Sequence, residues 1–276
     1  MFPSLVRPQA NDTDAALYNV ASHAVMGGIG ALINKKPDEK RGKVLLKGMY
    51  QGALGGYLAF ESKRLVRQFS RTGNYAYLWP SKLVNTAGNS ITYNAASNRN
   101  FWERWHIDYG FSYLEYDFKR EKRLRYRVLP FALYGNISGF ATAKFDLRRT
   151  LYTGQFVFED SELKSNFVDE VAGVAQVSTV YYDSSLKGLE NREIIAHELV
   201  HVYQYNDFFA ANAYLNGPMA VWDQKSPLLR TYHKVFKTDF NWLLKSGLYG
   251  LESTLGVGYE DLFFEREAFY YSRQRF

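Results

Sequence analysis

The sequence predicts an α+β fold with a helical hairpin at the N-terminus, an antiparallel β-meander in the middle and a helical region at the C-terminus. Two helix-like runs joined by a polar turn fill residues 13–69, and apolar and polar side chains alternate with the two-residue period of strands across residues 104–159. Helical periodicity returns after residue 170. With 276 residues, of which 46% are hydrophobic, the chain is long enough to bury a sizeable core.

The N-terminal hairpin is predicted from residues 13–34 and 43–69, with Thr13 or Asp14 as the cap of its first helix. Both helices contain glycines, which weaken a helix and are expected where two helices approach closely. These are Gly27, Gly28, Gly30, Gly48, Gly52, Gly55 and Gly56. We therefore expect a helix pair packed through small residues. A membrane-seated hairpin is the alternative, although neither run reaches the roughly 18 uninterrupted apolar residues of a typical spanning helix.

The middle of the chain is predicted to form a helix followed by a sheet. Residues 81–100 are interpreted as a helix with a polar face. From Trp105 onward the alternation favours about four antiparallel strands between residues 104 and 159. Because four strands cannot close a barrel, a soluble sheet is favoured over a membrane barrel. The basic run Lys119–Arg127 is interpreted as the solvated tip of a hairpin in this sheet.

The C-terminal part is predicted to begin with a strand and to continue as helices. The strand covers residues 173–185. Helices are expected at residues 189–209, 226–247 and 259–273, the second of them capped by Ser226.

The chain carries no internal repeat and no Pro-rich linker. A boundary near residues 160–170 would divide it into a region 1–160, for which no function is predicted, and a region 161–276, which contains the motif described below. One continuous domain is the alternative.

Composition excludes several kinds of function. The absence of cysteine rules out disulfides, thiolate catalysis and Cys-ligated zinc. A net charge of +6 is too small to be a nucleic-acid signature, so no nucleic-acid partner is predicted. No apolar segment of signal-peptide length precedes Asp12, and the compartment stays open between bacterial envelope, periplasm and cytoplasm.

The chemically informative motif is His-Glu-x-x-His, from His197 to His201. On a helix the two histidines lie one turn apart on the same face, so both imidazoles can reach one ion about 2.0–2.1 Å away. Glu198 can then take a proton from a water molecule at that ion. The flanking residues are apolar, which buries the helix, and buried His and Glu side chains each need a polar partner. Zn²⁺ would serve all three; the alternative is a pair of core histidines bonded to neighbouring hydroxyls.

A third metal ligand is expected on the last helix. The extended motif with a third His fails, because Gln204 stands where a turn-forming glycine is needed and Asp207 where the third His would be. Glu265 shares a helix face with the small residues Ala268 and Ser272, which would let this helix approach the motif helix. We therefore predict Glu265 as the ligand, with Glu267 as the alternative.

"HELVH" followed by a Glu-x-x-Ala helix resembles the gluzincin class of zinc metallopeptidases, over about residues 170–276. The resemblance implies Zn²⁺ bound by His197, His201 and Glu265, with Glu198 as the general base. It also implies that the strand at 173–185 pairs with an extended peptide or protein substrate. Such families often place an Asp four residues after the ligand Glu, where this chain has Phe269. The group that orients the ligand histidines by a hydrogen bond would then be Asn206, Asp207 or another group.

Candidates for stabilising an oxyanion are Tyr232, His233, Tyr259, Tyr270 and Tyr271. A non-catalytic zinc-binding or envelope-associated structural protein with a degenerate site is the alternative function. Binding of nucleic acid or lipid headgroups is suggested only by the basic run and ranks last. Membrane association is suggested only by the N-terminal hairpin.

Overall fold

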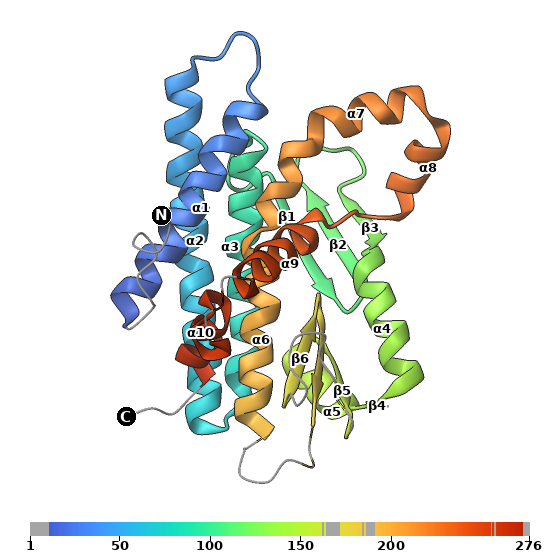
Figure 1. Cartoon of the computed structure of the whole chain (residues 1–276). Helices are drawn as coiled ribbons and strands as arrows, with labels where there is room; N and C mark the ends of the chain where they lie inside the picture. Colours follow the sequence, from blue (N-terminus) through green and yellow to red (C-terminus); the bar gives the residue numbers. More distant parts are fainter. Residues whose placement is uncertain are drawn as a thin grey trace.

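The fold is α+β, as the sequence predicts, and the helices surround two small sheets (Figure 1). The computed structural model describes residues 11–161, 163, 172–183, 185, 191–254, 256 and 258–272. The predicted boundary near residues 160–170 lies largely outside this part, as do residues 184, 189, 190 and 273 at the ends of predicted elements.

The N-terminal hairpin is confirmed and consists of α1 (Asp12–Ile33) and α2 (Arg41–Thr72). The helices pack through their glycines: a Cβ placed on Gly27 would lie 2.5 Å from the carbonyl oxygen of Gly48, so only glycine permits this approach. The predicted cap was wrong by two or three residues, because Asn11 accepts a hydrogen bond from the Asp14 N–H at 3.0 Å. After the 3₁₀ turn η1 (Tyr75–Tyr77), α3 (Leu78–Ala96) forms the predicted third helix and packs on α2.

The predicted four-stranded meander is only partly correct. β1 (Arg104–Tyr109), β2 (Ser112–Asp117) and β3 (Leu124–Val128) form a three-stranded antiparallel sheet. The next segment is the helix α4 (Pro130–Thr142), with Pro130 in its first turn. The alternation of apolar and polar residues wrongly predicted a strand there, because Gly135, Asn136 and Gly139 face inward at helical spacing. The predicted basic tip covers the turn between β2 and β3 and continues into β3; most of it is exposed, but Arg127, within β3, is buried against Glu115 at 3.0 Å.

A second sheet has the strand order β4-β5-β7-β6. It contains β4 (Lys144–Phe145), β5 (Phe156–Glu159), β6 (Gly173–Gln176) and β7 (Thr179–Tyr182), with the helix α5 (Leu147–Thr153) between the first two. β5 pairs with β7 in parallel and the other pairs are antiparallel. The single strand predicted for residues 173–185 is therefore a hairpin, which turns at Val177, a residue with a positive φ of 57°. β6 is the edge strand nearest α6.

The C-terminal half is built on α6 (Asn191–Asp207). η2 (Phe209–Leu215) and α7 (Asn216–Lys225) follow it. The single helix predicted for residues 226–247 is two helices, α8 (Pro227–Val235) and α9 (Phe240–Ser253), because between them the Lys237 N–H donates to the Val128 carbonyl beside β3. Ser226 does cap α8. η3 (Tyr259–Asp261) and α10 (Phe263–Ser272) complete the described chain.

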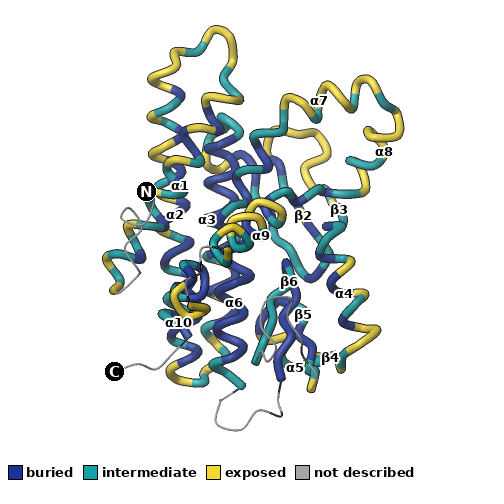
Figure 2. Tube along the Cα trace, viewed as in Figure 1, coloured by how far each residue is buried: buried dark blue, intermediate teal, exposed yellow. Residues whose placement is uncertain are grey.

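The core centres on α6, in which every residue from Ile194 to Tyr205 is buried (Figure 2). One hydrophobic cluster joins Phe60 and Phe69 of α2 to Leu199 of α6 and Tyr271 of α10. The motif helix is therefore held between the N-terminal hairpin, the second sheet and the last helix. Its His and Glu side chains are buried by this packing.

Candidate metal centre

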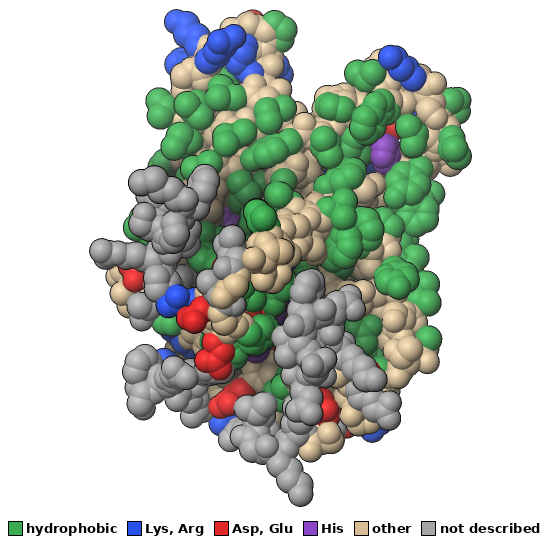
Figure 3. Space-filling model, in the orientation of Figure 1, with side chains coloured by type: hydrophobic (Ala, Val, Ile, Leu, Met, Phe, Trp, Pro, Cys, Tyr) green, Lys and Arg blue, Asp and Glu red, His purple; other side chains and the backbone are tan. Residues whose placement is uncertain are grey.

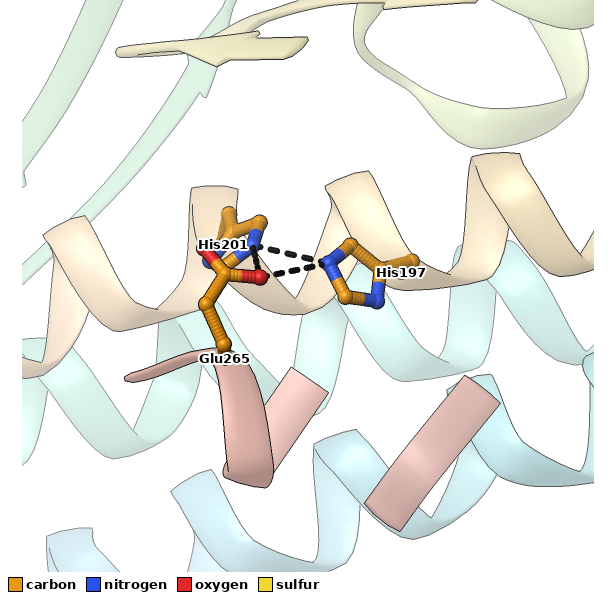
Figure 4. A group of neighbouring side chains, drawn as sticks. All are labelled: His197, His201 and Glu265. Atoms are coloured by element: carbon orange, nitrogen blue, oxygen red, sulfur yellow. Dashed lines mark hydrogen bonds and ion pairs between the residues drawn. The ribbon is translucent and has the colours of Figure 1, made fainter. Parts of the chain in front are cut away.

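The two motif histidines on α6 face Glu265 on α10 (Figure 4). His197 Nε2 lies 3.0 Å from Glu265 Oε2 and 3.0 Å from His201 Nε2, and His201 Nε2 lies 3.3 Å from Glu265 Oε2. All three residues are buried. The structure thus brings together the three residues that the sequence pattern selected.

The spacing of the three atoms fits one tetrahedral ion. Ligand atoms about 2.0–2.1 Å from such an ion lie about 3.3–3.4 Å from one another. The observed separations of 3.0 to 3.3 Å are close to this value. Two imidazole nitrogens and one carboxylate oxygen are also a donor set that zinc favours.

The tautomer of His201 is set by Gln204. The Gln204 Nε2 donates to the Phe264 carbonyl oxygen at 2.8 Å and to Glu267 Oε2 at 2.9 Å, so its Oε1 must be the atom that faces His201 Nδ1, 2.8 Å away. That oxygen can only accept, which places a proton on Nδ1. In the neutral ring, the lone pair of Nε2 then points at Glu265 and His197. Several lone pairs converge on one point, and a cation there would satisfy them together.

Glu265 is held from its other side by tyrosines. The Tyr249 hydroxyl donates to Glu265 Oε1 at 2.9 Å, and the Tyr259 hydroxyl also bonds to this carboxylate. Burial alone would raise the pKa of Glu265, but positive charge and N–H donors on His201 and His197, whose place a bound cation would take, outweigh burial and keep the pKa well below its usual range. The carboxylate is therefore ionised and oriented, as a metal ligand must be.

Glu198 lies between α6 and the edge strand β6. Its carboxylate accepts a hydrogen bond from the Ala175 N–H, and a Cβ on Gly173 would lie 2.7 Å from Glu198 Cγ, so glycine allows the strand to approach. Burial raises the pKa of Glu198 to about 7, against the opposing effect of His197. A carboxyl group with a pKa near neutrality can both accept and return a proton.

Lys245 of α9 is a buried cation beside these carboxylates. Its ammonium group lies 4.5 Å from the centre of the Tyr205 ring and 4.8 Å from that of Tyr249. Burial lowers the pKa of Lys245 to about 8, although Glu265 and Glu198 counteract this effect. Sequence analysis missed Lys245, Tyr249 and the role of Gln204. Only the fold of α9 over α6 brings Lys245 and Tyr249 to the site, and Gln204 was considered only as a failed turn position.

Other candidates lie elsewhere. Glu267 binds Lys63 at 2.8 Å as well as Gln204, so it is not the residue that faces the histidines. Asp207 pairs with Lys63 at 2.6 Å, and Asn206 donates to Asn85 at 3.2 Å, so neither orients a motif histidine. In place of the expected Asp, the ring of Phe269 packs on His197, with centroids 4.6 Å apart.

The proposed oxyanion donors separate into two groups. Tyr259 touches Glu265 and so belongs to the site. Tyr232 and His233 lie on α8, which projects away from α10 (Figure 1). His233 pairs with Asp223 at 2.6 Å and packs on the ring of Tyr232. Tyr270 donates to Asp12 of α1, and Arg67 of α2 lies over the rings of both Tyr270 and Tyr271, so both tyrosines face the N-terminal hairpin.

No family model, no curated protein and no solved structure matches this chain. The function is therefore inferred from the side chains of the site.

Proposed function

We propose that the protein is a gluzincin-like zinc metallopeptidase, with Zn²⁺ held by His197, His201 and Glu265. The observation that carries the proposal is the convergence of their three donor atoms, 3.0 to 3.3 Å apart, between two buried helices. Zinc at this point would polarise a substrate carbonyl and make water more acidic. Three protein ligands leave a position open for that chemistry.

Glu198 is the general base of the proposed reaction. It follows a ligand in the sequence and is an electrostatic neighbour of His197 and Glu265. Its carboxylate takes a proton from the attacking water and returns it to the departing amine. Lys245 supplies positive charge near the carbonyl oxygen that becomes negative.

The edge strand β6 is the proposed contact for an extended peptide substrate. At Ala175 of β6, the backbone groups are hydrogen-bonded to side chains of α6. The N–H donates to Glu198, and the carbonyl oxygen accepts from the Tyr205 hydroxyl at 3.5 Å. A substrate that pairs with β6 has to replace these two contacts. Its arrival would release Glu198 for catalysis.

The Glu198→Gln variant tests catalysis separately from metal binding. We expect it to retain one zinc per chain, measured by elemental mass spectrometry, and to lose peptide hydrolysis by at least about 10²-fold, because the amide cannot accept the proton. Hydrolysis of a peptide library by the wild type is the reference. A variant as active as the wild type would refute Glu198 as the base.

Lys245→Met tests the electrostatic role of the buried ammonium group. We expect zinc to be retained and kcat to fall by about 10²-fold, with a smaller change in KM, because the charge acts on the transition state. Lys234→Met, at an exposed position of α8, is the matched control. Equal kcat values for the two variants would remove Lys245 from the mechanism.

The second candidate is a non-catalytic zinc site in an envelope-associated protein. Enclosure favours it: the side chains of His197 and His201 are only 11% and 8% exposed, and Glu198 is engaged by β6. Tightly bound zinc in a wild type without peptidase activity would select this candidate.

A further inference from the structure

The outward face of α1 is apolar. Leu17, Val25, Ile29 and Ile33 recur at helical spacing and are 66%, 50%, 46% and 53% exposed. The inward face instead carries buried polar residues such as Asn19 and His23 together with glycines and alanines. A helix on the surface of a soluble protein has the opposite arrangement.

The N-terminal half of α2 also has an apolar outward face. Its outward residues Leu46, Tyr50, Leu54 and Tyr57 are 67%, 79%, 42% and 49% exposed. The side that faces α1 and α3 is lined by small and polar residues, namely Gly48, Gln51, Gly52, Gly55 and Gly56. Hydrophobic side chains accordingly gather over this part of the molecule (Figure 3). A continuous apolar surface on two adjacent helices is typical of a place where the protein contacts another apolar body.

The length of this apolar face suits a lipid bilayer. Among the described helices, α1 is the one long and apolar enough to cross a membrane, and only 33% of its apolar window is buried. The low burial distinguishes α1 from an ordinary core helix. From Leu17 to Ile33 the face extends for about 25 Å, close to the roughly 30 Å hydrocarbon layer of a bilayer.

Charged residues lie at both ends of this face. The turn between α1 and α2 and the first turn of α2 carry an excess of basic residues over Asp38 and Glu39. The basic residues are Lys35, Lys36, Lys40, Arg41 and Lys43. Lys and Arg side chains lie at the upper end of the α1–α2 hairpin in Figure 3. At the opposite end are Asp12, Glu61 and Arg64, which form ion pairs on the protein surface. Basic residues beside an apolar segment are attracted to anionic lipid headgroups.

We propose that the outward face of the α1–α2 hairpin lies in the hydrocarbon layer of a lipid bilayer, with the basic turn at anionic headgroups. Asn19 and His23, on the inward face of α1, form hydrogen bonds within the protein, as an apolar solvent favours. A second copy of the chain could also cover an apolar face. The charged ends and the length of the face favour the bilayer, and protein self-association is an outcome that the experiment separates.

The absence of cysteine allows a clean test in the full-length chain. Ile29→Cys, on the outward face, and Lys144→Cys, an exposed residue on β4, are each labelled with an environment-sensitive fluorophore. With vesicles of phosphatidylcholine and phosphatidylglycerol, we expect a blue shift at position 29 and quenching by lipids that carry a quencher on the acyl chain. Position 144 should show neither change. A blue shift at position 29 that needs no lipid and grows with protein concentration would replace the bilayer by a second copy. An unchanged spectrum under all conditions would overturn the proposal.

Charge reversal tests the headgroup contact. Lys36, Lys40 and Lys43 are changed together to Glu, and the control carries Glu in place of Lys122, Arg123 and Lys144, exposed residues outside the hairpin. We expect the first variant to lose the preference for phosphatidylglycerol over phosphatidylcholine vesicles in flotation, whereas the control keeps it. Equal loss in both variants would show a general effect of net charge and overturn the role of the turn.

Discussion

Two buried polar clusters lie on α6, and they differ in how their charges are balanced. In one, Lys63 of α2 lies between Asp207 at 2.6 Å and Glu267 at 2.8 Å, with Asn19 at 3.0 Å. In the other, Glu265 faces His197 and His201, and none of the described Lys or Arg side chains forms an ion pair with it. In the first cluster a cation of the chain contacts both carboxylates directly, whereas in the second Lys245 is a neighbour without a direct ion pair, and three donor atoms face one point.

The two clusters therefore differ in whether the chain itself supplies the cation that their buried carboxylates contact. Burying charges is costly unless they are paired, and Lys63 with its partners meets that condition within the chain. In the candidate metal centre no described Lys or Arg side chain forms an ion pair with Glu265, so a bound cation would complement its donor atoms. Gln204 joins the two clusters, because its amide contacts both His201 and Glu267.

The largest expected effect is the loss of the metal from one glutamate variant and not from the other. Glu265→Ala removes a proposed ligand and should reduce zinc from one per chain to none. Glu267→Ala removes a partner of Lys63 and should leave zinc in place. Elemental mass spectrometry after gel filtration measures both. Loss of zinc from Glu267→Ala, with retention in Glu265→Ala, would reverse the assignment of the two clusters.

Helical periodicity in the sequence predicted which residues share a helix face, because this depends only on their spacing. Glu265, Ala268 and Ser272 lie on one face of a helix by their spacing, and all three are buried in α10. The long helices were predicted nearly to their ends, because their apolar and small residues repeat over many turns. Asn11 was missed as a cap because several capping residues stand side by side.

The remaining features depend on distant parts of the chain. Small residues and aromatics in α4 fit both the helical and the strand period, and only packing on β5 and β7 decides between them. The orienting role of Gln204 requires the Phe264 carbonyl, 60 residues later. The sequence also showed that α1 is apolar, but only the fold shows that its polar side is the buried one.

Lys63→Met should destabilise the protein strongly. It leaves the carboxylates of Asp207 and Glu267 buried without their cation, which costs about 3–5 kcal/mol of the free energy of unfolding. Chemical denaturation followed by circular dichroism measures the change, and Lys43→Met, at an exposed position, should stay within about 0.5 kcal/mol of the wild type. A small effect at Lys63 would mean that the first cluster is not balanced by this residue.

Gln204→Leu should have a smaller and more specific effect. It removes the acceptor that holds the Nδ1 proton of His201 while leaving all three ligands in place, so we expect zinc affinity to fall by about 10- to 100-fold. Asn206→Leu is the control, since Asn206 bonds to Asn85 and not to a motif histidine. Competition with a chelator of known affinity measures both variants. Equal affinities would mean that packing alone orients His201, and the two clusters would then be neighbours without being coupled.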